Sequence, residues 1–118
     1  MSLSTRQFFH VAPRSQRGSI DRHGIDASLG EPVWEESADD PGNYLWSSVR
    51  DARTYRSMVE SLSASDDWPN YTGPEGERFD VYEVNRPGHL PAPALDYDAD
   101  NAYVTAKPIP RSWVRRVE

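Results

Sequence analysis

The chain has 118 residues, a formal net charge of −6 and 36% hydrophobic residues, among them four Trp and six Tyr. This length fits one domain, and bulky aromatic side chains can fill a small core. The acidic balance argues against general nucleic-acid binding, and the lack of cysteine excludes disulfides and thiolate sites and fits a cytoplasmic protein. Because no apolar run approaches the roughly 20 residues of a membrane span, no membrane association is expected.

The first folded segment expected is a strand. Residues 1–7 show no apolar pattern and are predicted to form a flexible N-terminus, followed by a single domain over residues 8–118. The apolar run Phe8–Ala12 is typical of a buried strand, and Pro13 ends it.

A short helix is predicted from Ser15 to His23. The Ser15 hydroxyl can cap its first turn, and Ile20 would face the core. Gly24 stands where a left-handed residue commonly ends a helix.

A second and longer helix is predicted after a polar loop and a short strand, Tyr44–Ser47. Ser48 and Asp51 resemble a capping box at its start, and it should end near Ser63. Its apolar face is expected to carry Ala52, Tyr55, Val59 and Leu62.

The second half of the chain reads mainly as strands. Phe79–Arg86 alternates between two faces, and shorter strands are predicted at Tyr103–Thr105 and Trp113–Val117. This order predicts an α+β fold with two helices in the first half of the chain. The expected core residues are Trp46, Val81, Val104 and Val114, with Ile20, Val59 and Leu62 packing the helices on them.

Three short motifs occur, each once, along this order of elements. The first places a His at a strand end, an Ile on the next helix and a Gly after it, here His10, Ile20 and Gly24. The second is Gly-x-Tyr before a helix that carries another Tyr, here Gly42-Asn43-Tyr44 and then Tyr55.

The third motif is Ala102-Tyr103-Val104-Thr105, followed by the closing segment Lys107–Val114 with its Pro-Ile-Pro and Trp. Together the motifs resemble the ADP-ribosyltransferase fold, in its diphtheria-toxin and poly(ADP-ribose) polymerase branch. That branch carries a His, a Tyr and a Glu on three strands. The resemblance covers about residues 8–117 and implies small split antiparallel sheets and NAD as the cofactor. Two departures are that Val11 and Ala12 replace Gly and Ser or Thr, and that Ala102 replaces the Glu.

The resemblance also implies roles for single residues. His10 would bond the adenine-side ribose, Tyr44 and Tyr55 would sandwich the nicotinamide, and the three rings should line one pocket. The implied ligand-contacting positions are His10, Ala12, Arg14, Gly42, Tyr44 and Tyr55. A purely structural interpretation also stands for most of them: His10 as a half-buried histidine bonded to a backbone carbonyl, the two tyrosines as core aromatics, Gly42 as a turn residue and Arg14 as a solvated surface arginine.

The missing glutamate leaves the function open. The residues considered as substitutes are Glu83, Asp100 and Asn101. Three functions remain: an NAD- or ADP-ribose-binding protein with little or no transferase activity, an active mono-ADP-ribosyltransferase that uses a substitute acid, and a non-enzymatic interaction domain of a bacterial or phage accessory protein with a protein target. The three histidines lack metal-ligand spacing, so no metal site is expected.

Overall fold

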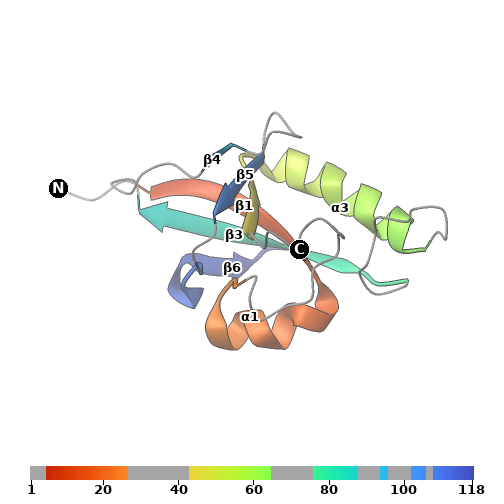
Figure 1. Cartoon of the computed structure of the whole chain (residues 1–118), viewed down its shortest axis with the longest axis horizontal. Coiled ribbons are helices and arrows are strands. Elements are labelled where there is room, and N and C mark those ends of the chain that lie inside the picture. Colours follow the sequence, from red (N-terminus) through yellow and green to blue (C-terminus); the bar gives the residue numbers. More distant parts are fainter. Residues whose placement is uncertain (1–4, 27–42, 65–75, 88–93, 96–101, 106–107) are drawn as a thin grey trace.

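The computed structural model describes residues 5–26, 43–64, 76–87, 94–95, 102–105 and 108–118. These residues form an antiparallel sheet with the strand order β4-β5-β2-β1-β3-β6 and two α-helices, which confirms the predicted α+β class (Figure 1). The strands are β1 (Thr5–Pro13), β2 (Asn43–Trp46), β3 (Phe79–Pro87), β4 (Ala94–Leu95), β5 (Ala102–Thr105) and β6 (Val114–Arg116). The helices are α1 (Arg17–His23) and α3 (Val49–Ser63), with the 3₁₀ turns η1 (Arg14–Gln16) and η2 (Arg111–Trp113).

The longest pair of strands in the sheet is β1–β3, with nine residues in each strand. The two strands are in register from Thr5 opposite Pro87 to Pro13 opposite Phe79. Because β1 begins at Thr5, residues 5–7 belong to the sheet, and the prediction of a flexible segment over residues 1–7 is wrong for them. The pairing with β3 orders this polar end of the strand, which has no apolar signal of its own.

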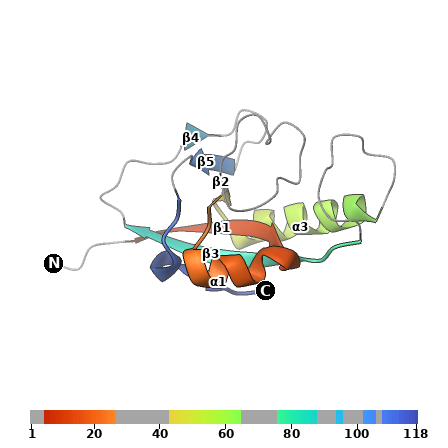
Figure 2. The ribbon, with the colours of Figure 1, turned by 60° about the horizontal axis from the view of Figure 1, so that its bottom comes forward.

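The junction between β1 and β2 is narrow. A single pair, Phe9 opposite Trp46, joins the two strands, whereas all four residues of β2 pair with β5. The sheet therefore consists of two groups, β4-β5-β2 and β1-β3-β6, which meet at one position; Figure 2 shows the first group rising away from the β1–β3 pair. The expectation of split sheets is wrong in that form, because the six strands make one hydrogen-bonded sheet, joined between β2 and β1 by a single residue pair.

Each face of the sheet buries its own apolar cluster. On the face covered by α1, the buried residues are Phe8, Ala12, Ile20, Ile25, Leu45, Tyr82, Val84 and Ile109. On the face covered by α3, the cluster contains Phe9, Ala52 and Val81, with Val11, Trp46 and Val49 packed against it. Val81, Ile20, Val59 and Leu62 are buried as predicted, whereas Trp46 and Val114 are only partly buried; the side chain of Val104 lies outside the described part.

Helix α3 begins as its sequence predicts. The Ser48 hydroxyl accepts a bond from the Asp51 amide at 3.2 Å and donates to the Asp51 carboxylate at 3.0 Å. The helix ends at Ser63, which confirms the predicted boundary. Within the described residues, no helix is long and apolar enough to span a bilayer.

Helix α1 begins later than predicted. The chain leaves β1 through η1, whose first amide, on Arg14, donates to the Arg78 carbonyl at 2.9 Å. Ser15 lies inside this turn, is exposed and caps nothing, so its predicted role as N-cap is wrong. Gly24 follows the helix with φ 78°, as predicted, and its amide donates to the Ile20 carbonyl.

Candidate functional site

The narrow junction between β1 and β2 is spanned by a side chain. Nδ1 of His10, on β1, lies 2.7 Å from the carbonyl oxygen of Tyr44, on β2. A carbonyl oxygen can only accept, so Nδ1 carries the hydrogen and Nε2 of the neutral ring is left as an acceptor. No partner for Nε2 is found among the described residues.

The surroundings of His10 favour its neutral form. Burial lowers the pKa of the imidazole, and the bond to the Tyr44 carbonyl offsets only part of that effect. The ring lies 6.5 Å from the ring of Tyr82, on the face of the sheet that α1 covers. His10 is therefore a neutral hydrogen-bond acceptor with a fixed tautomer.

The three predicted rings do not share one face. Phe9 and Trp46 are directly paired and pack in the cluster beneath α3, so alternation turns His10 to the opposite face and Tyr44 to the face of Trp46. The Tyr55 ring, on α3, packs against Trp46 with 5.1 Å between centroids. Tyr44 and Tyr55 thus lie on the α3 side, and the expectation that all three rings line one pocket is wrong in that form.

The position that would carry the missing glutamate is at the start of β5. Ala102 is paired with Trp46, and Tyr44 with Val104. The His, Tyr and Glu positions of the resemblance, His10, Tyr44 and Ala102, therefore stand on three neighbouring strands, β1, β2 and β5.

Glu83, one of the predicted substitute acids, is engaged elsewhere. It is paired with Phe9, so it faces the side of the sheet opposite His10. Its carboxylate accepts bonds from Asn85 at 2.9 Å and from Arg115 at 3.0 Å, and these bonds hold its pKa below the ordinary value. The other predicted residues near the reaction centre, Gly42, Asp100 and Asn101, lie outside the described residues.

Two of the predicted ligand contacts have structural roles. Ala12 is buried in the apolar cluster on the α1 face. Arg14 points its Nε at a carboxylate oxygen of Asp80, 3.4 Å away, rather than standing free for a phosphate. The local sequence shows an arginine after a strand, and only the long-range contact decides what it meets.

A buried ion cluster on the α1 face was missed from the sequence. Asp80 is fully buried, and both its oxygens accept bonds from Arg17, at 2.9 and 2.7 Å. Burial, the largest single influence, would raise the pKa of Asp80, but the Arg17 bonds together with the charges of Arg17, Arg14 and Arg116 hold the pKa below its ordinary value. Burial and the nearby Asp80 raise the pKa of the Tyr82 phenol to about 12. The available signal was an aspartate on the same face of an alternating strand as Tyr82 and Val84.

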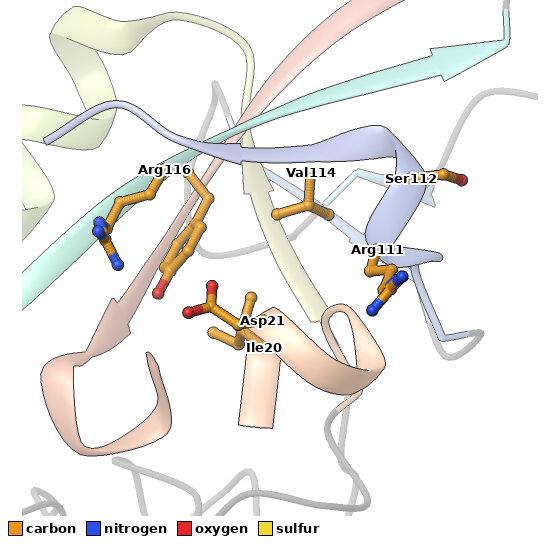
Figure 3. Close-up of a pocket in the computed structure, with 7 residues that line it drawn as sticks. Ile20, Asp21, Arg111, Ser112, Val114 and Arg116 are labelled. Carbon is orange, nitrogen blue, oxygen red and sulfur yellow. The ribbon is translucent and has the colours of Figure 1, made fainter. Parts of the chain in front are cut away.

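A pocket of about 320 Å³ opens beside this cluster, between α1 and the C-terminal segment (Figure 3). Ile20 and Asp21 of α1 form one side, and Val114 and Arg116 of β6 form the other. None of the predicted ligand-contacting residues lines it.

Comparison with protein families, curated proteins and solved structures finds no match. The function must therefore be argued from the geometry of this chain alone. Within the described residues no cluster of three or more His, Asp and Glu side chains could hold a metal ion.

Proposed function

We propose that this protein binds NAD or an ADP-ribose-type ligand at the junction between β1 and β2, and that it transfers ADP-ribose slowly or not at all. The observation that carries the proposal is the bond from His10 Nδ1 to the Tyr44 carbonyl across that junction. It leaves Nε2 as a fixed acceptor, which suits a ribose hydroxyl that must donate.

The junction itself supports this choice of site. The β1–β2 ladder is reduced to the Phe9–Trp46 pair, so the strands can diverge where His10 faces Tyr44. Backbone groups at such a divergence need other partners, which a polar ligand such as a dinucleotide can supply.

The ligand's route follows from the positions of the rings. The imidazole of His10 lies on the α1 side, whereas Tyr44 shares the α3 side with the Trp46–Tyr55 pair. A ligand whose ribose bonds His10 therefore approaches from the α1 side, and Tyr44 and Tyr55 on the other face do not contact it.

Weak or absent catalysis follows from Ala102. Breaking the nicotinamide bond builds positive charge on the ribose, and a methyl group cannot stabilise it. Glu83 cannot replace the missing acid from the opposite side of β1, where Asn85 and Arg115 hold it. Losing one well-placed electrostatic group costs a factor of about 10²–10³ in rate.

The binding test is a calorimetric titration of the wild-type chain with NAD and with ADP-ribose. His10→Ala should weaken binding about tenfold, whereas His23→Ala, the same change at an exposed histidine, should leave it unchanged. His10→Gln, which keeps a donor and an acceptor, should fall between them. A folded wild type that binds neither compound would overturn the proposal and leave the interaction domain as the function.

The catalytic test is nicotinamide release by the wild type and by Ala102→Glu. Slow release by the wild type, raised in the variant, is expected if the junction holds NAD in a productive pose. Fast release by the wild type would reject the weak-transferase part of the proposal. It would then favour the active mono-ADP-ribosyltransferase, with Asp100 or Asn101 as the residues to change next.

A further inference from the structure

The face that carries α1 holds more arginine than its carboxylates can pair. Arg17 occupies both oxygens of the buried Asp80, and Arg14 approaches the same group at 3.4 Å. Arg116 also acts on Asp80 through its charge, although its guanidinium forms no ion pair with any described residue. This surplus of positive charge is local, because the whole chain has a net charge of −6.

A second arginine without an ion pair among the described residues stands at the same pocket. Arg111, on η2, lines the pocket together with Arg116, and in Figure 3 the two lie toward opposite ends with Asp21 between them. Asp21 is exposed. It is the one carboxylate among the residues that line the pocket, and a single carboxylate cannot neutralise both guanidinium groups.

The remaining wall of the pocket combines apolar surface with a hydroxyl group. Ile20 and Val114 supply the apolar part, while the hydroxyl of Tyr82, which also lines the pocket, donates to Asp80 at 3.5 Å. Because the pKa of Tyr82 is raised to about 12, its phenol stays neutral near pH 7 and adds no negative charge. The volume of about 320 Å³ is at the lower end of the range for small-molecule pockets.

We infer that this pocket binds a small organic anion, whose phosphate or carboxylate group pairs with Arg116 while its apolar body lies on Ile20 and Val114. The planar guanidinium fork matches both kinds of oxyanion in a bidentate way. The site does not include the proposed contact at His10, so it stands independently of NAD binding.

The test is a titration of the full chain with inorganic phosphate, phenyl phosphate and benzoate, in which the amide chemical shifts of the protein report binding. Phenyl phosphate or benzoate should bind more tightly than inorganic phosphate, because only these two place a ring on the apolar wall. Whichever of phenyl phosphate and benzoate binds more tightly identifies the anionic group as phosphate or carboxylate. Shifts should concentrate on α1, η2 and β6.

The variants separate a built site from general charge attraction. Arg116→Gln should weaken binding of the better probe about tenfold, and Arg116→Lys, which keeps the charge without the fork, should weaken it less. Arg115→Gln is the matched control, because Arg115 is the adjacent residue of β6, is exposed and bonds Glu83. His10→Ala should leave the affinity for the probe unchanged, which keeps this result separate from the NAD test.

Two outcomes would overturn the inference. One is that none of the three probes binds the folded wild type saturably. The other is that Arg115→Gln weakens binding as much as Arg116→Gln does, since that would show attraction to positive charge in general rather than to this pocket.

Discussion

Arg17 donates to both carboxylate oxygens of Asp80, and this bidentate pair fastens the start of α1 to the start of β3. The two residues lie 63 positions apart in the chain. Asp80 is fully buried, whereas the Arg17 side chain keeps 39% of its surface exposed. The carboxylate therefore depends on its partner for solvation, while the guanidinium can still turn to water.

Asp80→Asn should lower the free energy of unfolding by about 2–4 kcal/mol, measured by urea denaturation. Breaking a buried ion pair costs roughly 3–5 kcal/mol, and the exposure of Arg17 reduces that loss. Asp21→Asn, at an exposed aspartate, is the control and should change stability by less than about 0.5 kcal/mol. Because the folded pKa of Asp80 is lowered, its contribution is present above the unfolded value near 3.9 and is lost as the pH falls through the folded value. An unchanged stability of Asp80→Asn at neutral pH would contradict this account.

His10 should make the protein less stable on mild acidification. Its pKa is lowered by burial in the folded state, so below about pH 6.5 the unfolded chain binds the proton more readily. Stability is then complete above that pH and declines below it. His10→Gln should show a shallower decline between about pH 6.5 and 5 in thermal melts at each pH, and His23→Gln should keep the wild-type slope. Parallel curves for wild type and His10→Gln would show that burial of the imidazole has no effect on its proton affinity.

Gly24 and Gly18 should respond in opposite directions to alanine. Gly24 has φ 78°, and a β-carbon there would lie 2.1 Å from the Ile109 carbonyl oxygen, so Gly24→Ala should cost at least about 3 kcal/mol. Gly18 lies inside α1, where the nearest contact would be the Arg22 side chain at 3.6 Å. Gly18→Ala should therefore stabilise by about 0.5–1 kcal/mol. Denaturant midpoints of the two variants check this. A tolerated Gly24→Ala would refute the close approach of Gly24 to the Ile109 carbonyl oxygen.

Val81→Asp should abolish cooperative unfolding. Val81 is fully buried beneath α3, in the interior strand β3, where an unpaired carboxylate has no partner and costs several kcal/mol. Met58→Asp, on the exposed side of α3, is the control and should melt close to the wild type. A normal melting transition for Val81→Asp would contradict the assignment of Val81 to a buried strand.

Local patterns in the sequence determined the main elements. The apolar run from Phe8, the alternation from Phe79 and the Ser48 cap each predict a strand or a helix that is found, because these signals depend on neighbours within a few residues. The resemblance placed His10 at a strand end, whereas it lies inside β1, paired with Tyr82. The local patterns did not reveal that Thr5 to Gln7 belong to β1, since pairing with a distant strand orders that segment.

The tertiary structure alone decided how the site residues meet. Whether His10 and Tyr44 share a face depends on the register of one pair, Phe9 with Trp46, and a strand reverses its faces with every residue. In the same way, the partner of Arg14 and Arg17 is a carboxylate more than 60 positions away. The sequence determined which chemical groups stand on which element, and long-range strand pairing decided which of those groups came into contact.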